Sequence, residues 1–538
     1  MWEKHRLWAS TERSPDNLGK ESVQPRKGIP AQATSWQCLQ SNNLKQMKIM
    51  KLNALKYVMG AALMALSLNS CNDFLDEQPV SEIPADQMWK TARDAKAGIN
   101  ELYGLFRTTM RTNYFYWGEF RSDNVAPGAP AMADQARVIN NQMSTDEACA
   151  KWTGLYEVIN QANLAIKYIP GISMPNVSDR DDYLGQAYAM RALAYFYAIR
   201  VWGDVPLFTE PTEKYSDDIY RERTDRNYIL SEVILPDLKK AEDLINRTNN
   251  RERKRISICG VWAIMADVYM WMKDYNMAEQ TIDKISDITN KDGSRFVDFE
   301  PNIETWHKML TEELNNKPSD NTPSTDEYST KELIFVIHFD MDEVGTNGYS
   351  YMYQWFTGSG NRAAVVSDKV VSLFDAADMQ GDLRKDYLIK NYQNGNELRK
   401  FISGDISSTQ NKICEVAYPV YRYSDLLLLK AEALVHQSKW DEALDIVKKI
   451  RDRAGLSTPT ALDFASEEDL LDYVMRERQV ELLGEGRRWF DLLRTDTWKE
   501  VMGPINGLQD DGNELFPIHY SHIIENPKIT QNPYYGNK

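Results

Sequence analysis

The feature that most constrains the fold is an internal repeat, in which segment 263–285 matches segment 428–450. The aligned pairs include Ala266 with Ala431, Tyr275 with Trp440, Ala278 with Ala443 and Ile285 with Ile450. This order of small, aromatic and small residues is typical of a tetratricopeptide helix pair, whose alanines let two helices approach closely while the aromatic residue fills the turn. One pair cannot bury its own apolar face and must stack on neighbouring helices. The repeat therefore predicts a helical stack.

Other segments of the body show the same helical character. Residues 146–169 and 181–201 place apolar and aromatic side chains at steps of three and four, and Gly203 ends the second of these patterns. Segments 227–246 and 257–286 predict further helices with breaks between them.

Two segments are loop-like, because 292–425 and 503–538 are rich in turn-forming residues. Within the first, LIFVIHF at 333–339 predicts a strand or a buried segment. Long irregular insertions on a helical scaffold often carry the functional surface.

The N-terminal region contains a secretory signal. Residues 57–70 are free of charge and follow several lysines, but the run is shorter than the about 20 apolar residues that span a bilayer. Met47 starts a suitable basic region, so we predict a signal peptide at 47–70. We interpret 1–46 as a spurious or disordered extension. The lysines are Lys45, Lys48, Lys51 and Lys56.

Cys71 follows this apolar run directly. Its thiol could be a redox group, a metal ligand, a core residue or the site at which the chain is cut and modified. Segment 68–71, LNSC, resembles a bacterial lipobox, although Asn69 departs from the usual small or apolar residue. In that class the cysteine becomes the first residue and carries three acyl chains, whereas stable membrane anchoring needs two membrane-binding signals. We therefore expect lipidation at Cys71 and a flexible tether at 71–90. An ordinary signal peptide with an incidental cysteine is the alternative.

The net charge and the positions of the cysteines and histidines limit which nucleic-acid or metal partners the protein can have. The net charge is −16, with a basic leader before a strongly acidic body, so nucleic acid is not an expected partner. No CxxC pair occurs, and Cys149, Cys259 and Cys414 fit small buried residues. We expect no metal role for the HxxH pair of His519 and His522.

Three carboxylates, Glu477, Glu481 and Glu485, recur at steps of four and would share one face of a helix. Paired carboxylates can act as acid and nucleophile in a glycosidase. An ion network that joins helices explains the same pattern, because four arginines surround them: Arg476, Arg478, Arg487 and Arg488. The sequence contains no GxSxG, HExxH, P-loop or GxGxxG pattern, so we expect no catalytic residue and no enzymatic activity.

An aromatic run, YSYMYQWF at 349–356, lies between Gly- and Asn-rich stretches. Its rings are Tyr349, Tyr351, Tyr353 and Trp355. Exposed rings on loops suit sugars, because the apolar face of a pyranose stacks on a ring and a flat side chain loses little conformational entropy. A β-strand with one packed face is the alternative.

A second run, NYFYWGEFRSDN at 113–124, contains Tyr116 and Trp117, followed by Arg121 and Asn124. Guanidinium and amide groups beside rings are suitable partners for sugar hydroxyls. Because the run follows a predicted helix at 92–108, packing in the core is the alternative.

Five motifs, in this order, resemble the SusD/RagB family of surface nutrient-binding lipoproteins. They are CNDFLDEQP from Cys71, RALAYFYAIRVWGDVPLF at 191–208, YRYSDLLLLKAEAL at 421–434, RERQVELLGEGRRWFDLLR at 476–494 and LFPIHYSHIIENPKITQNPYY at 515–535. The resemblance covers nearly the whole mature chain. His519 departs from it, since the family usually has proline there.

The resemblance implies a mainly α fold, a tetratricopeptide-like helical superhelix with an irregular, loop-rich capping region and little β-structure, in a single domain over 91–538. It also implies a lipoprotein anchored in the outer membrane and facing the cell exterior. Its partner would be a SusC-like TonB-dependent transporter, to which it delivers captured oligosaccharides. Family members bind glycans without hydrolysing them, and no cofactor is implied.

The resemblance also points to binding residues. In the family's starch-binding type, ligand aromatics lie partly in a segment that corresponds to 124–142, which contains no aromatic residue here. The second family site, in the long insertion, corresponds to 349–356. We therefore expect Tyr351, Tyr353 and Trp355 to contact the glycan first. The secondary polar partners would be Arg121, Asn124, Asn361 and Arg362. A tetratricopeptide scaffold that orders an outer-membrane complex without binding ligand is the alternative function.

Overall fold

The computed structural model describes ten ranges of the chain: 88–129, 132–213, 219–247, 253–290, 293–314, 330–340, 350–356, 362–391, 395–402 and 416–536. The predicted signal peptide, Cys71, Cys414, Tyr349 and Asn361 lie outside the described residues. Among the helices in these ranges, none is both long and apolar enough to cross a bilayer.

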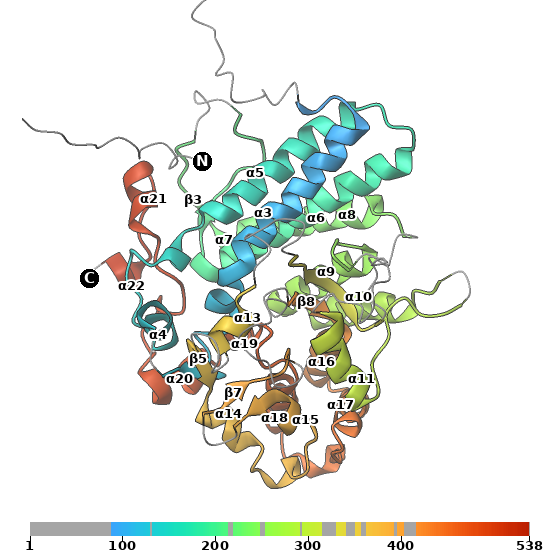
Figure 1. The fold of residues 1–538 in the computed structure, drawn as a ribbon, viewed down its shortest axis with the longest axis vertical. Coiled ribbons are helices and arrows are strands. Elements are labelled where there is room, and N and C mark those ends of the chain that lie inside the picture. The colour runs from blue at the N-terminus through green and yellow to red at the C-terminus, as the bar shows by residue number, and fades with distance from the viewer. Residues whose placement is uncertain are drawn as a thin grey trace, which may run out of the picture. The chain divides into compact units, whose positions relative to one another are not determined.

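The N-terminal part is a stack of long helices in which each packs on the next (Figure 1). They are α3 (Ala92–Gly118), α5 (Thr153–Tyr168), α6 (Val177–Trp202) and α8 (Leu235–Leu244). The N-terminus of α3 is a capping box between Thr91 and Asp94, which satisfies backbone donors that a helix start leaves unpaired. Apart from Tyr188, helix α6 is buried from Leu184 to its end and is rich in alanine, so its neighbours approach closely from several sides.

The sequence repeat forms two helix pairs, which confirms the predicted fold class. The pairs are α9 (Ile258–Trp271) with α10 (Tyr275–Asp287), and α16 (Tyr423–His436) with α17 (Trp440–Arg453). Tyr275 and Trp440 each begin the second helix of a pair, and the turn before each contains a left-handed residue, Lys273 or Ser438, with the same φ of 59°. Because α10 packs on α16, the two pairs adjoin in one stack, which continues into α18 (Glu467–Glu481).

The described β-structure consists of antiparallel two-stranded sheets. They pair β1 (Val125–Pro127) with β5 (Ala364–Val366), β2 (Val205–Pro206) with β3 (Arg223–Thr224), β4 (Leu333–Ile337) with β8 (Tyr418–Arg422), and β6 (Ile389–Lys390) with β7 (Glu397–Leu398). Segment 333–339, for which a strand or a buried segment was predicted, contains the buried strand β4. Through β1–β5 the insertion 292–425 is held against the chain that follows α3.

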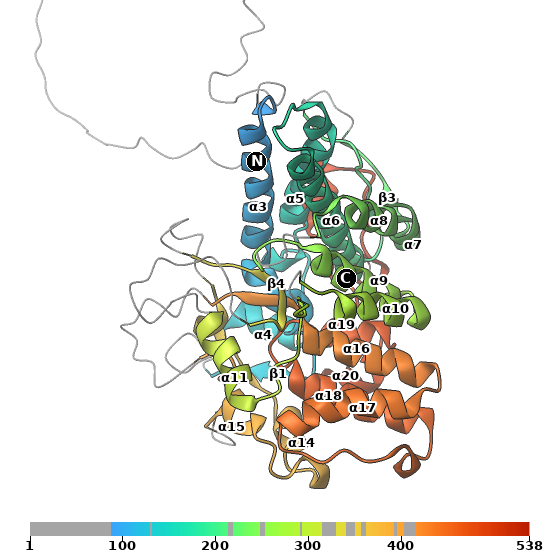
Figure 2. The ribbon, with the colours of Figure 1, turned by 90° about the vertical axis from the view of Figure 1, so that its right-hand side faces the viewer.

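The remaining helices are short and lie mainly in the insertion and the C-terminal part. They are α4 (Ala133–Ile139), α7 (Arg226–Ile229), α11 (Ile303–Lys308), α13 (Met352–Phe356), α14 (Asp368–Leu373), α15 (Arg384–Leu388), α19 (Arg488–Arg494), α20 (Trp498–Asn506), α21 (Tyr520–Glu525) and α22 (Pro533–Gly536). Figure 2 shows α11 and α15 of the insertion to the left of α16–α18. The C-terminal segment returns to the end of α6, where the Phe516 N–H donates to the Val201 carbonyl at 2.8 Å.

Candidate functional site

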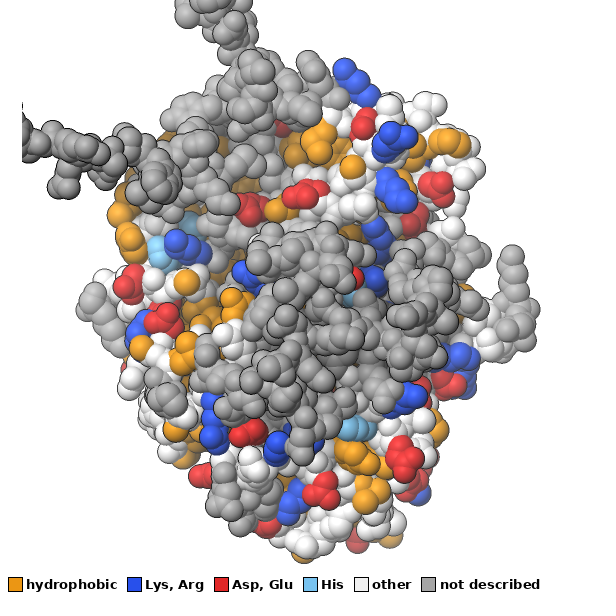
Figure 3. Space-filling model, viewed as in Figure 1, with side chains coloured by type: hydrophobic (Ala, Val, Ile, Leu, Met, Phe, Trp, Pro, Cys, Tyr) orange, Lys and Arg blue, Asp and Glu red, His pale blue; other side chains and the backbone are white. Residues whose placement is uncertain are grey.

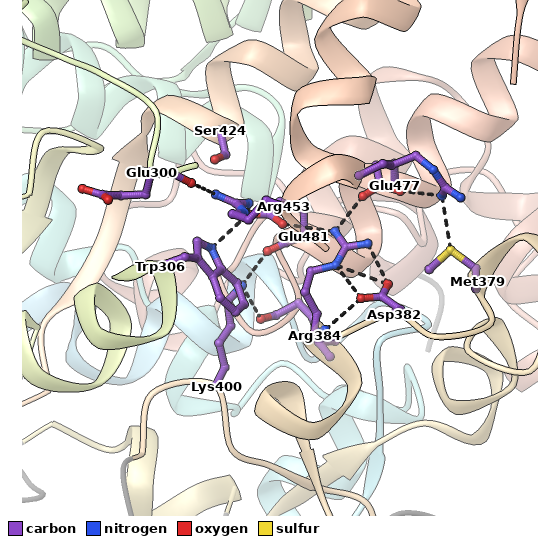
Figure 4. Close-up of polar contacts among 12 residues, drawn as sticks. Glu300, Trp306, Met379, Asp382, Arg384, Lys400, Ser424, Arg453, Glu477 and Glu481 are labelled. Atoms are coloured by element: carbon purple, nitrogen blue, oxygen red, sulfur yellow. Dashed lines mark hydrogen bonds and ion pairs between the residues drawn. The ribbon is translucent and has the colours of Figure 1, made fainter. Parts of the chain in front are cut away.

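The three carboxylates of α18 and its C-terminal turn belong to a buried ion network. Five cationic and five acidic side chains take part, namely Arg384, Lys400, Arg422, Arg451 and Arg453 with Glu332, Asp382, Glu477, Glu481 and Glu485. Figure 4 shows Arg384 of the insertion pointing at Glu477 and Glu481. Its Nη1 lies 2.6 Å from Glu477 Oε1 and 3.1 Å from Glu481 Oε2. The interpretation as an ion network, left open above, is the one that this geometry supports.

The electrostatics of this network do not suit a glycosidase acid, which needs a raised pKa. Burial by itself would raise the pKa of Glu481, but the guanidinium groups of Arg453, Arg422 and Arg384 hold that pKa well below its usual value of 4.5. The pKa of Glu485 is lowered against burial in the same way, chiefly by Arg422 and Lys400. Burial lowers the pKa of the Lys400 ammonium to about 8. Glu481 and Glu485 are therefore buried, ionised and paired with cationic side chains.

The four surrounding arginines pair with aspartates outside this network, and two of them share Asp425. Arg478 bridges Asp425 and Asp491, while Arg487 bridges Asp425 and Asp267. Both therefore join α18 and the turn after it to neighbouring helices. The other two differ in exposure: Arg476 pairs with Asp378 near the surface, and Arg488 pairs with the buried Asp123 at 2.8 Å.

Trp355 and Trp117, two of the predicted sugar-binding rings, are buried. Trp355 is 4% exposed and packs against Phe115, Tyr116 and Phe120 with ring centroids 5.3–5.8 Å apart. Trp117 is fully buried, and its Nε1–H donates to the Cys149 carbonyl at 2.9 Å. Both indoles fill the core, which is the alternative named for the second run.

Arg121, Asn124 and Tyr116 are also committed to internal contacts. Arg121 is fully buried, donates from Nε to Asn141 at 2.7 Å and lies over the Trp489 ring at 4.4 Å. Asn124 donates to Glu119 at 2.8 Å. The Tyr116 hydroxyl accepts from the Gln135 amide at 2.7 Å. These side chains join distant segments of the chain, and a glycan contact by any of them stays a prediction.

Tyr351, Tyr353 and Arg362 are partly exposed. Residues 352–356 form helix α13, not the loop expected at 349–356 nor the strand named as its alternative. The Tyr351 ring packs against Trp355 at a tilt, with centroids 4.9 Å apart. The Arg111 guanidinium lies 5.6 Å from the Tyr351 ring centroid. Arg362 adopts a left-handed φ of 45° and donates to the Gly395 carbonyl at 2.8 Å. A role of these three in glycan binding stays a prediction.

A groove that the sequence did not indicate lies between α3, α6 and β4, with a volume of about 780 Å³. Its α3 wall includes Lys96, Asn100, Tyr103 and Arg107. These residues recur at steps of three and four, so they form a polar stripe along one face of α3. That stripe was the feature of the sequence from which the groove could have been predicted.

The described residues contain no cluster of three or more His, Cys, Asp or Glu side chains that could hold a metal ion. His522 instead accepts a hydrogen bond from the Trp152 N–H at 3.2 Å, and burial lowers its pKa to about 4. Cys149 and Cys259 are buried thiols, as their sequence context indicated.

Family models and a curated relative match most of the chain. Residues 73–270 match the family model described as "Starch-binding associating with outer membrane", and residues 270–535 match the SusD family model. SusD-like protein P38 of Formosa agariphila is 33% identical over 508 residues, which cover 87% of this chain and 96% of that protein.

Solved structures share the fold. A laminarin binding SusD-like protein superposes with a TM-score of 0.65 at 21% identity, over 83% of this chain and 100% of that one. Surface glycan-binding protein A from Bacteroides fluxus has a TM-score of 0.65 at 19% identity, also over 83% of this chain and 100% of its own. Together with the ordered motifs, the two family models and the close relative, this shows that the chain belongs to the SusD family.

Proposed function

We propose that this protein is a cell-surface glycan-binding lipoprotein, which captures oligosaccharides and passes them to a SusC-like TonB-dependent outer-membrane transporter. The observation that carries the proposal is membership of the SusD family, whose models match residues 73–270 and 270–535. The N-terminal family model is described as starch-binding, and two proteins of the same fold are described as binding laminarin or surface glycans.

The ligand would contact Tyr351 and Tyr353 at α13. This short helix is held rigidly, because Trp355 and Phe356 pack against Phe115 and the Tyr351 N–H donates to the Tyr418 hydroxyl at 2.7 Å. A ring fixed before binding loses little entropy when a sugar stacks on it. The Arg111 guanidinium beside Tyr351 supplies hydrogen-bond donors for hydroxyl groups.

Replacing Tyr351 and Tyr353 by alanine is expected to weaken glycan binding about tenfold, since we expect the two rings together to contribute on the order of 1.4 kcal/mol. A glycan array identifies the ligand, and calorimetry then measures its affinity for the wild-type protein and the variant. Tyr228→Ala is the matched control, because Tyr228 is 53% exposed on α7. Trp355→Ala is unsuitable here, because emptying a buried indole site destabilises the protein.

Two results would argue against the proposal. If wild-type protein binds no array glycan and its deletion leaves nutrient uptake unchanged, capture is not its function. If binding occurs but the double variant retains wild-type affinity, the ligand contacts another surface. A scaffold that orders the membrane complex predicts that Tyr351 and Tyr353 are dispensable for growth on every glycan.

The membrane anchor would be the acylated thiol of Cys71. Cys71→Ala is expected to abolish palmitate labelling and to move the protein out of the membrane fraction, because the acyl chains provide the apolar area that holds it there. Cys414→Ala is the control, because this cysteine lies in the part of the chain that follows Cys71, and it should keep both properties. Persistent labelling of Cys71→Ala would disprove the lipobox interpretation without bearing on glycan binding.

A further inference from the structure

One face of α3 connects the groove to the tyrosines of α13. Lys96, Asn100, Tyr103 and Arg107 line the groove, and Arg111 continues the same stripe to the Tyr351 ring. Steps of four, three, four and four residues keep these side chains on one side of a helix. At about 1.5 Å per residue the stripe is roughly 22 Å long, the scale of an extended ligand and not of a single sugar.

The polar groups of the groove are held in place before any ligand arrives. Arg255 donates to the Asn100 amide oxygen and lies 5.1 Å from the Tyr103 ring centroid. The Tyr103 hydroxyl accepts from the Ile256 N–H at 2.9 Å. On the opposite wall Gln186 donates to Asp182 at 2.6 Å. Such fixed donors and acceptors favour a ligand that presents many hydroxyl groups.

The charges of the groove are nearly balanced, although the chain as a whole has a net charge of −16. Its lining includes Lys96, Arg107, Lys254 and Arg255 together with Glu101, Asp179 and Asp182. On the face seen in Figure 3, residues of both signs are interspersed among hydrophobic side chains. A surface with little net charge gives no strong preference for sulfated, uronate-rich or cationic ligands.

We propose that this groove binds the continuation of a neutral oligosaccharide whose other end stacks at Tyr351. The inference rests on the proposed glycan capture and adds a second, separate part to its binding surface. The partly exposed rings of Tyr103 and Tyr183 lie in the groove beside the amides of Asn100 and Gln186, which are the groups that bind a sugar's apolar face and its hydroxyls.

The test measures affinity against oligosaccharide length. Malto-, laminari-, xylo- and manno-oligosaccharide series are titrated into the full-length protein by calorimetry, with polygalacturonate as a charged probe. The groove variant is Asn100→Ala with Tyr183→Ala, and Tyr228→Ala is again the control. Melting temperatures establish that each variant is folded.

We expect wild-type affinity for one neutral series to rise with chain length. The groove variant should bind the shortest members like wild type but lose about tenfold in affinity for the longest. An unchanged length dependence would overturn the groove site while glycan capture stands. Tighter binding of polygalacturonate than of every neutral series would overturn the neutral assignment. No binding of any series by wild-type protein would overturn both proposals.

Discussion

Replacing Glu481 by glutamine is expected to lower the free energy of unfolding by about 3–5 kcal/mol, the usual cost of removing one member of a buried ion pair. The Glu481 carboxylate is fully buried and pairs with Arg384, Arg422 and Arg453. An amide supplies no charge, and its NH₂ group would face guanidinium donors that need an acceptor. Three buried cations would share an incomplete set of partners.

Urea unfolding of the purified protein measures this effect. Glu468→Gln is the matched control, because Glu468 is an exposed residue of the same helix α18 and should change stability by only about 0.5 kcal/mol or less. Equal effects of the two substitutions would contradict a structural role for the network. Restored stability on adding Arg384→Met to Glu481→Gln would identify the unpaired cation as the cause.

The network explains the charge pattern of the C-terminal motif at 476–494. Desolvation makes buried ion pairs a poor source of net stability, but they specify which segments meet. Here Arg384 and Lys400 of the insertion reach Glu477, Glu481 and Glu485, so the loop-rich region is held on the helical stack by charge pairing.

The partners of that motif were not predictable from the sequence. Its glutamates and arginines were visible at helical spacing, whereas the residues that pair with them come from distant positions such as Glu332, Arg384 and Arg422. Helical periodicity reports only neighbours within one element. The repeat was predictable for the opposite reason, because the spacing around Tyr275 and Trp440 is local.

The aromatic run at 349–356 shows how a local pattern misleads. Alternating rings indicated a loop or a strand. Tyr351, just before α13, and Trp355 within it are also four residues apart, and their rings pack against each other at a tilt. Burial of Trp355 depends on Phe115 and Phe120 of a distant segment, which no window around the run contains. Arg121 was expected near a ligand because guanidinium groups suit sugar hydroxyls. It is instead buried, where Asn141 and the Glu514 carbonyl accept its hydrogen bonds.

A second junction lies where the end of α3 meets the turn at 484–486. The Glu119 carboxylate accepts from the Gly484 N–H at 2.9 Å and the Gly486 N–H at 3.0 Å. The Tyr114 hydroxyl donates to the Glu485 carbonyl at 2.6 Å. Burial raises the pKa of Glu119 to about 7, because the charged carboxylate is removed from water at this contact. The turn positions Glu485 for the ion network, so the end of α3 is joined here to the C-terminal motif at 476–494.

Gly118 makes this approach possible. A Cβ at Gly118 would lie 2.6 Å from the carbonyl carbon and 2.9 Å from the Cα of Gly486, so the backbone of one segment must move. Gly118→Ala is therefore expected to lower the free energy of unfolding by about 3 kcal/mol, toward the upper end of the cost of overpacking.

Gly104→Ala is a control in the same helix, for which we expect the free energy of unfolding to change in the opposite direction. Its Cβ would meet only the Glu101 carboxylate, at 3.9 Å, so the change should stabilise α3 by about 0.5–1 kcal/mol through its better helix propensity. Thermal or urea unfolding of the two variants separates the effects. Helix propensity alone predicts that both alanines stabilise the protein, and a Gly118→Ala variant as stable as wild type would show that the junction tolerates a side chain. Opposite signs would establish that close backbone contact, and not flexibility, requires glycine where α3 meets the turn that carries Glu485.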